Sequence, residues 1–158
     1  MTPLTSCVLW CAGMVNSRAK GSSAEREVAA ILFDELGLTF KRDLEQYRSA
    51  DRGDLLCDEM DFPAVIEVKR YAKGTQAQPR WWDQVCKASK TAGKWPLLVY
   101  RYDRQDWRWR MPAQALVDLG AGINYRGARP DAEYDWAYAV EMDTRTAMTL
   151  LREMISNV

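Results

Sequence analysis

Two repeating patterns of apolar and polar positions predict helices and strands along most of the chain. In residues 22–36 and 79–92, apolar side chains recur every three or four positions, which is the period of a helix that buries one face. Gly37 and Gly93 follow these segments, as expected where a helix ends. Short apolar and β-branched runs predict strands that begin at Asp54 and that cover residues 38–43, 63–71, 96–102 and 107–110.

The last third of the chain continues this alternation of helices and strands. Its pattern predicts a short helix at residues 112–119, a glycine-rich loop at 120–132, a strand at 134–141 and a closing helix at 143–155. It contains no group of residues typical of a catalytic site. Three roles stay open for it: covering a sheet edge, forming a dimer interface or selecting a partner.

The length and composition predict one domain. With 158 residues, of which 47% are hydrophobic, the chain can bury a core of its own. We expect the domain to cover residues 17–158, as a core at 18–111 and a C-terminal α/β extension at 112–158. Residues 1–16 carry no charge, and their apolar patch is too short to span a membrane. They predict a loosely ordered tail, with Met14 as an alternative start.

Acidic and basic side chains meet in two neighbouring predicted strands. Asp54 opens the first strand, and the second carries Glu67 and Lys69 on one face because strand side chains alternate. Two converging carboxylates repel each other unless a cation, a shared proton or a basic neighbour is present. Oxygen ligands favour Mg²⁺ or Mn²⁺, and a lysine beside the metal could orient or deprotonate an attacking water. The pattern therefore indicates phosphodiester hydrolysis, against the alternative of a solvated strand face with a Glu–Lys pair.

The order Asp54, Glu67-Val68-Lys69 resembles the signature of the PD-(D/E)XK nucleases. Upstream, residues 20–27 (Lys-Gly-Ser-Ser-Ala-Glu-Arg-Glu) precede an amphipathic helix and look like the Gly-Ser-x-x-Glu-Arg element of archaeal-type Holliday junction resolvases. In those enzymes this element supplies a third acidic residue, which here is Glu25. The resemblance covers about residues 18–102, and it departs from the family at Gly53, where proline is usual.

This resemblance implies a restriction-endonuclease-like α/β fold, with a mixed central β-sheet flanked by helices and the active site at one end of the central strands. The metal ligands that it implies are Asp54, Glu67, the Val68 carbonyl and Glu25. The catalytic residues that it implies are Glu25, Asp54, Glu67, Lys69 and Gln84. It also places Ser49 near the scissile phosphate. For Glu25 the alternative is helix capping, because Ser22-x-x-Glu25 is a capping-box pattern.

Basic residues are concentrated in residues 62–110, which hold 11 lysines and arginines against 4 acids, although the whole chain has no net charge. This local excess fits a phosphate-binding face. The residues that we expect to contact DNA are Arg18, Lys20, Ser49, Arg52, Arg70, Lys73, Arg80, Lys87 and Lys90. Among the aromatic residues, we expect Trp81 in the core and Trp82 exposed, where it could stack on an opened base. In residues 107–110, two tryptophans alternate with two arginines and should face opposite sides of their strand.

The absence of histidine from the sequence excludes Ser-His-Asp and Cys-His catalysis, histidine-metal nuclease motifs and two-histidine RNase chemistry. The four cysteines show no spacing typical of a zinc site, and we expect reduced thiols in a cytoplasmic protein. We expect neither an organic cofactor nor a membrane partner.

These patterns predict a Mg²⁺- or Mn²⁺-dependent nuclease. The resemblance implies more closely an endodeoxyribonuclease that cleaves branched DNA, like a Holliday junction resolvase, and acts as a homodimer. A phage-encoded enzyme of this kind is among the expectations. Two alternatives stay open: a restriction-like or repair endonuclease with another DNA substrate, and a non-catalytic DNA-binding protein that retains the fold.

Overall fold

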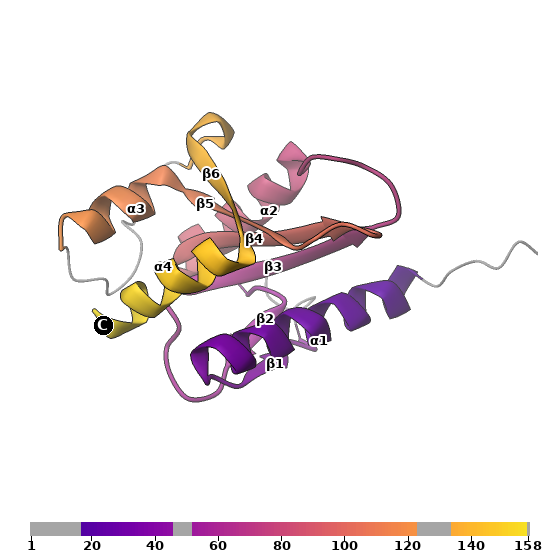
Figure 1. The fold of residues 1–158 in the computed structure, drawn as a ribbon, viewed down its shortest axis with the longest axis horizontal. Coiled ribbons are helices and arrows are strands. Elements are labelled where there is room, and N and C mark those ends of the chain that lie inside the picture. Colours follow the sequence, from indigo (N-terminus) through magenta and orange to yellow (C-terminus); the bar gives the residue numbers. More distant parts are fainter. Residues whose placement is uncertain (1–16, 46–51, 123–133, 158) are drawn as a thin grey trace, which may run out of the picture.

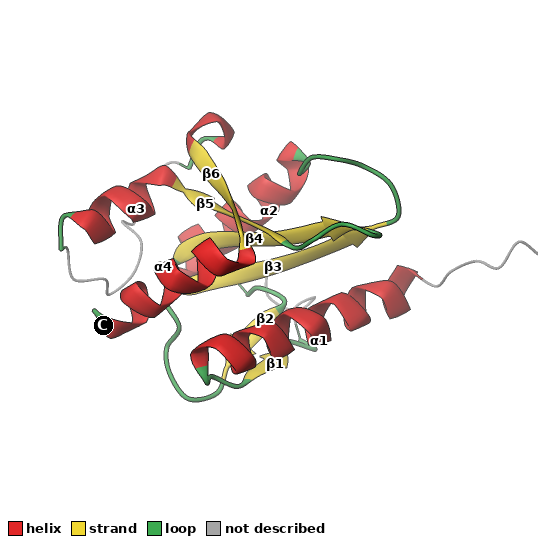
Figure 2. Cartoon of the chain, viewed as in Figure 1, coloured by secondary structure: helices red, strands yellow, loops and turns green. Residues whose placement is uncertain are grey.

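The structure, a computed structural model, describes residues 17–45, 52–122 and 134–157, with side chains from residue 19 onward. These residues form one mixed sheet with the strand order β1-β2-β3-β4-β5-β6 and helices on both faces (Figures 1 and 2). The strands are β1 Phe40–Arg42, β2 Leu55–Cys57, β3 Ala64–Tyr71, β4 Trp95–Tyr102, β5 Arg108–Pro112 and β6 Ala139–Asp143. The helices are α1 Ser17–Leu36, α2 Pro79–Ala92, α3 Ala113–Gly120, the 3-10 helix η1 Trp136–Tyr138 and α4 Thr144–Ser156. The predicted α/β class with a mixed sheet is confirmed.

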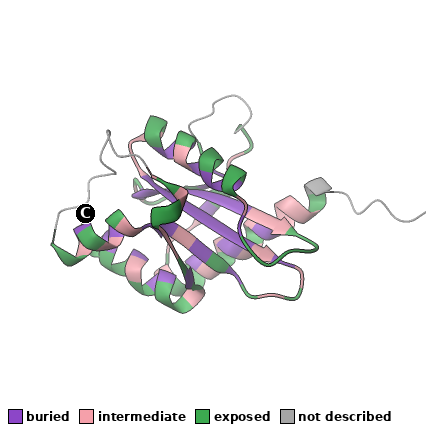
Figure 3. Cartoon of the chain, turned by 90° about the horizontal axis from the view of Figure 1, so that it is seen from above, coloured by how far each residue is buried: buried purple, intermediate pink, exposed green. Residues whose placement is uncertain are grey.

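The two long central strands, β3 and β4, pair in parallel, and every other neighbouring pair in the sheet is antiparallel. A parallel pair needs a crossover connection, and α2 supplies it. α2 packs on one face of β3 and β4, whereas α1, α3 and α4 share a core with the other face. In Figure 3, the buried residues run along the central strands.

Alternation along β3 divides its side chains as the sequence predicted. Ile66 and Val68 lie in the core beneath α1 and α4, whereas Val65 packs with α2 on the opposite face. The strand pattern of residues 107–110 is confirmed too: Trp107 and Trp109 are buried in the α1 and α4 core. Arg108, between them, is exposed.

Helix α2 has the predicted bounds. Pro79 occupies its first turn, where the missing N–H costs nothing, and Gly93 ends it in the left-handed conformation. Trp81 is buried as expected, but the exposed position predicted for Trp82 is wrong. Trp82 is only 1% exposed, and its indole N–H donates to the Tyr134 carbonyl at 3.0 Å. The segment before β6 covers this side of α2, and helical periodicity alone could not reveal that.

Helix α1 begins at Ser17, five residues before the predicted start. Ser22 therefore lies inside the helix, where its hydroxyl donates to the Ala19 carbonyl at 3.1 Å. Because a capping residue must stand at the helix start, the capping-box interpretation of Glu25 is wrong. The predicted end is confirmed, since Gly37 has a φ of 70° and its N–H donates to the Phe33 carbonyl at 2.9 Å.

The last third completes the sheet and one of its two cores. β6 begins at Ala139, later than predicted, because residues 136–138 form the 3-10 helix first. It pairs with β5, so this segment covers that strand's edge. Asp143 ends the strand and caps α4 by accepting a hydrogen bond from the Thr146 N–H at 2.7 Å. None of the helices in the described residues is both long and apolar enough to cross a lipid bilayer.

Candidate active site

Asp54 is fixed at the point where β2 and β3 separate. These strands are paired at Leu55 and Ile66, and the Asp54 N–H donates to the Ile66 carbonyl at 2.7 Å. At the next position on this edge of β3, the Asp54 side chain takes the place of a backbone partner, because its Oδ2 accepts a hydrogen bond from the Val68 N–H at 2.6 Å. Asp54 as a residue is 7% exposed. The pairing of two short segments therefore places a buried acid against the edge of β3.

Gly53 allows this approach. A Cβ at Gly53 would lie 2.4 Å from the Ile66 carbonyl oxygen and 2.9 Å from the Ile66 nitrogen. Both are backbone atoms of a central strand, so neither can move aside cheaply. This contact gives the physical reason for glycine where the resemblance led us to expect proline.

Replacement of Gly53 by alanine should therefore destabilise the protein and displace Asp54. We expect a loss of roughly 1–3 kcal/mol in the free energy of unfolding, which is the usual range for added volume in a packed site. Denaturant titration of the variant checks this. Gly21→Ala is the matched control, because a Cβ at Gly21, inside α1, would meet no atom within 4 Å. Equal stability of the two variants would contradict the close packing of Gly53.

Glu67 lies at the centre of the site and is 2% exposed. Its Oε1 accepts hydrogen bonds from the Lys69 ammonium and from the Gln84 amide of α2, each at 2.6 Å. Burial and the nearby Asp54 charge raise the pKa of Glu67 to about 7, although Lys69 opposes the shift. Burial lowers the pKa of Lys69, but the Glu67 charge outweighs it and holds that pKa above its ordinary value. The site thus keeps two carboxylates and one ammonium in a poorly solvated space.

Glu25 comes to the same site from α1, but it has a partner that the sequence analysis missed. The Arg42 Nε of β1 donates to the Glu25 carboxylate. Burial and the Asp54 charge raise the pKa of Glu25, and the bond to Arg42 opposes the rise. Strand alternation could have revealed this residue, because Arg42 shares a face of β1 with Phe40, which packs in the core with α1. The role of Glu25 as a metal ligand stays a prediction.

A cavity of about 410 Å³ opens beside Glu25, Asp54 and Lys69. Its lining comes from the first half of α1, from Asp54 before β2 and from the end of β3, and comprises Lys20, Gly21, Glu25, Asp54, Val68, Lys69, Arg70, Tyr71 and Ala72. The N–H and C=O of one strand residue point to the same edge, so the Val68 carbonyl faces the side on which Asp54 lies.

These oxygen atoms suit a hard divalent cation. Asp54, Glu67 and the Val68 carbonyl would form an open set rather than a closed cage, which suits Mg²⁺ because this ion keeps several of its waters. In the described part of the chain, no group of three or more Asp, Glu or Cys side chains is close enough to hold a metal ion. A cation between Asp54 and Glu67 would relieve the repulsion that raises the pKa of Glu67.

The predicted DNA contacts fall into two groups. Lys20 and Arg70 line the cavity, and both pair with Asp103, at 3.0 and 3.1 Å. Arg70 also pairs with Glu27 at 2.8 Å, so these cations connect α1 to the ends of the central strands. The second group is exposed and consists of Arg52, Lys73, Arg80, Lys87 and Lys90. Ser49 and the Arg18 side chain lie outside the described residues.

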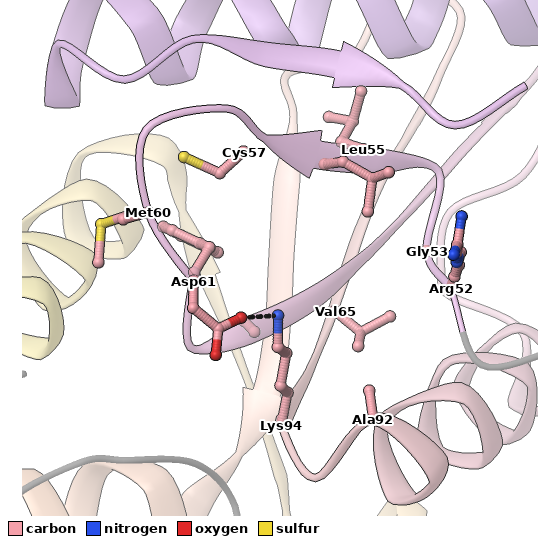
Figure 4. A pocket seen from close by; sticks show the side chains of 12 residues that line it. Arg52, Gly53, Leu55, Cys57, Met60, Asp61, Val65, Ala92 and Lys94 are labelled. Atoms are coloured by element: carbon pink, nitrogen blue, oxygen red, sulfur yellow. Dashed lines mark ion pairs between the residues drawn. The ribbon is translucent and has the colours of Figure 1, made fainter.

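A second cavity of about 420 Å³ lies between residues 52–57 and the end of α2 (Figure 4). Gly53 and Leu55 line it on one side, and Ala92 of α2 on the other. Lys94 pairs with Asp61 at 2.5 Å across this cavity. Lys94 is therefore paired with an acid that lies outside residues 62–110. Arg80, Lys87 and Lys90 are exposed cations of α2.

A protein family and a solved structure are similar to this chain. Residues 16–155 match the model of a protein family described as "Phage putative PDDEXK endonuclease". Among solved structures, the chain is similar to Hjc, a Holliday junction resolvase from the archaeal hyperthermophile Archaeoglobus fulgidus, with 18% identity and a TM-score of 0.43. That alignment covers 57% of this chain and 70% of the resolvase. No curated protein sequence matches the chain.

Proposed function

We propose, because this chain belongs to the family of phage putative PDDEXK endonucleases, that it is a Mg²⁺- or Mn²⁺-dependent enzyme that hydrolyses phosphodiester bonds in branched DNA. The observation that carries the proposal is the burial of Asp54 and Glu67 together, with Lys69 bound to Glu67 at 2.6 Å. Burying two acids is costly unless a cation or proton compensates them. If Asp54 and Glu67 had only a structural role, the Lys69 charge would be enough to stabilise them. Here Asp54 and Lys69 also line a cavity that a metal ion and a phosphate could enter.

Asp54, Glu67 and the Val68 carbonyl would hold the metal ion. When bound, such an ion supplies Lewis-acid activation of water and neutralises charge at the scissile phosphate. Gln84 fixes the orientation of Glu67 by donating to its Oε1 at 2.6 Å. Gln84 belongs to α2, and Lys69 belongs to β3. Glu67 is therefore held by hydrogen bonds from two different elements.

Lys69 serves two purposes in this scheme. Its ammonium group donates to Glu67 Oε1 and lines the cavity, where a phosphate would bind. A positive charge fixed there stabilises the extra negative charge that develops on the phosphate during attack. Because the pKa of Lys69 is raised, the group stays charged and can hold the attacking water by donation.

Branched DNA as the substrate is supported by the sequence order of Glu25, Asp54, Glu67 and Lys69, which matches the resolvase-like pattern. Cleavage at symmetric positions of a junction requires two active sites, so we propose a homodimer. We also propose a cytoplasmic location. A restriction-like or repair endonuclease would use the same site on another DNA structure.

The test is incubation of the protein with Mg²⁺ and labelled four-way, flap, duplex and single-stranded DNA of related sequence. Faster cleavage of the four-way junction than of its duplex arms supports the proposal. Equal cleavage of all duplex-containing DNAs would favour the restriction-like alternative. DNA binding without cleavage in Mg²⁺ or Mn²⁺ would favour the non-catalytic alternative.

The exposed cations of α2 give a separate prediction about DNA binding. Gln84 reaches the active site from α2, so Lys87, one turn further along the helix, should lie beside the DNA that enters it. Each phosphate contact removed lowers the log–log salt slope of the affinity by about 0.9. We expect Lys87→Ala with Lys90→Ala to give a shallower slope, with similar losses on branched and duplex DNA.

This prediction is measured by binding in Ca²⁺ at several salt concentrations. Arg145→Ala is the control, because Arg145 is an exposed cation on α4, which packs on the other face of the sheet. An unchanged slope in the Lys87 and Lys90 double variant would place the DNA on another surface, with Arg108 on β5 as the next candidate.

A further inference from the structure

Tyr71 is an aromatic residue at the mouth of the active-site cavity. It is the last residue of β3 and lies on the same face as Glu67 and Lys69. Its exposed fraction is 41%, and it lines the cavity together with Asp54 and Lys69. The exposed ring is therefore next to the groups that would carry out hydrolysis.

One face of the Tyr71 ring is fixed from behind. The ring stacks on Trp81 of α2, with ring centroids 4.9 Å apart and an angle of 14° between the planes. Trp81 is itself 2% exposed and is wedged against Tyr100 and Tyr102, with centroid distances of 5.9 and 6.2 Å. A near-parallel pair anchored in the core holds the outer ring in one orientation. A further ring could stack on it with little loss of side-chain entropy.

Other exposed large apolar side chains lie elsewhere. In the described residues these are Phe33, Leu44, Leu56, Val117 and Tyr138, and none of them lines the active-site cavity. Exposure of a single apolar side chain is ordinary on a protein surface. Tyr71 differs because its exposed ring is aromatic, stacked from behind and surrounded in the cavity by the cations Lys20, Lys69 and Arg70.

We infer that Tyr71 is a stacking platform for an unpaired nucleobase beside the scissile phosphate, and that it thereby makes the site selective for DNA with an opened base, as at a branch point. This inference rests on the proposed nuclease function and deepens it. Both faces of a base inside a continuous duplex are already covered by neighbouring base pairs. A base at a branch or bulge can present a free face, and stacking on an aromatic side chain tolerates any base.

Fluorescence and binding in Ca²⁺, which commonly supports binding by such nucleases without cleavage, test the inference. The two probes are a four-way junction with 2-aminopurine at the branch point and a fully paired duplex with 2-aminopurine in the same sequence. On the wild-type protein, stacking should quench the junction probe and leave the duplex probe unchanged. This readout needs no variant, so it holds even if a variant folds poorly.

Substitutions of Tyr71 distinguish stacking on a base from a contact that any DNA would make. Tyr71→Leu should weaken binding of the junction by about 5- to 150-fold, the loss expected for one base–aromatic stack, and change duplex binding less than about twofold. Tyr71→Phe should restore junction binding and quenching because it keeps the ring. Tyr138→Leu is the matched control, since Tyr138 is a more exposed tyrosine on the 3-10 helix before β6. Thermal unfolding of each variant confirms that it is folded.

Equal losses on junction and duplex, or no loss on either, would overturn the inference. So would the absence of quenching when the wild-type protein binds the junction. These results differ from a failure of the proposed function, in which the wild-type protein cleaves none of the DNAs in Mg²⁺ or Mn²⁺. If the wild-type protein cleaves DNA but Tyr71→Leu acts alike on paired and branched substrates, the nuclease proposal stands and the stacking platform does not.

Discussion

Glu67→Gln is expected to abolish DNA cleavage while it leaves folding and DNA binding nearly intact. Residues that only orient a metal ligand typically contribute 10- to 100-fold, so loss of a ligand's charge should lower the cleavage rate by more than about 100-fold. A glutamine has almost the same shape, and its amide oxygen can still accept from Lys69 and Gln84, which both bind Glu67 Oε1. Asp54→Asn should behave in the same way, because its oxygen can still accept from the Val68 N–H.

The structure adds a second readout to this experiment. Burial and the Asp54 charge raise the pKa of Glu67 to about 7, so the charged form is unfavourable in the folded protein. Removal of that charge should raise the melting temperature without metal. Mg²⁺ should stabilise the wild-type protein, because a ligand of the folded state adds to its stability, but it should not stabilise Glu67→Gln.

Cleavage in Mg²⁺, binding in Ca²⁺ and thermal unfolding with and without Mg²⁺ measure these effects. Glu153→Gln is the control, because Glu153 is an exposed acid on α4. Wild-type turnover by Glu67→Gln would refute its assignment as a metal ligand.

Lys69→Ala should chiefly slow the chemical step. With DNA saturating, we expect the single-turnover rate to fall by about 10²- to 10⁴-fold, the range typical of a group that positions or activates a nucleophile. The variant leaves buried Glu67 without its ammonium partner, so the pKa of Glu67 should rise further. Lys69→Met is the companion variant, because it keeps most of the side-chain volume and removes only the charge.

Two kinetic measurements decide the role of Lys69. A lower saturated rate with similar affinity assigns it to the transition state, whereas weaker binding with an unchanged saturated rate reduces it to a phosphate contact. Lys41→Ala is the control, since Lys41 is a largely exposed lysine on β1 that pairs with Asp58 at 2.7 Å. The same measurements on Lys41→Ala should match those of the wild-type protein.

Those parts of the site that depend on short-range periodicity could be predicted from the sequence. Glu67 and Lys69 had to share a face because strand side chains alternate, and Asp54 directly precedes β2, the strand that pairs with theirs. The bounds of α2 follow from the residues at its ends, since Pro79 suits a first turn and Gly93 can adopt a left-handed conformation. Trp109 points into the core and Arg108 toward solvent because neighbouring side chains of a strand alternate between its two faces.

The partners of these residues depend on contacts between distant segments. The sequence pattern gave no sign of the ion pair between Lys20 and Asp103, which are 83 positions apart. The burial of Trp82 depends on Tyr134, whose carbonyl accepts its indole N–H. The helical period of α2 does not show which distant residue packs against that helix. The start of α1 was placed too late because the serines at 22 and 23 suggest a cap, although the helix continues through them.

By itself, then, the sequence determined the order of the main helices and strands, the face that each β3 side chain takes and that Asp54, Glu67 and Lys69 can converge, because these follow from local period and chain order. Only the tertiary structure decided that Arg42 holds Glu25, that Gly53 presses against the backbone of Ile66, and that Tyr71 rather than Trp82 presents an exposed ring. Each of these depends on how two elements far apart in the chain approach each other. That approach is set by the packing of the whole core, which no local pattern encodes.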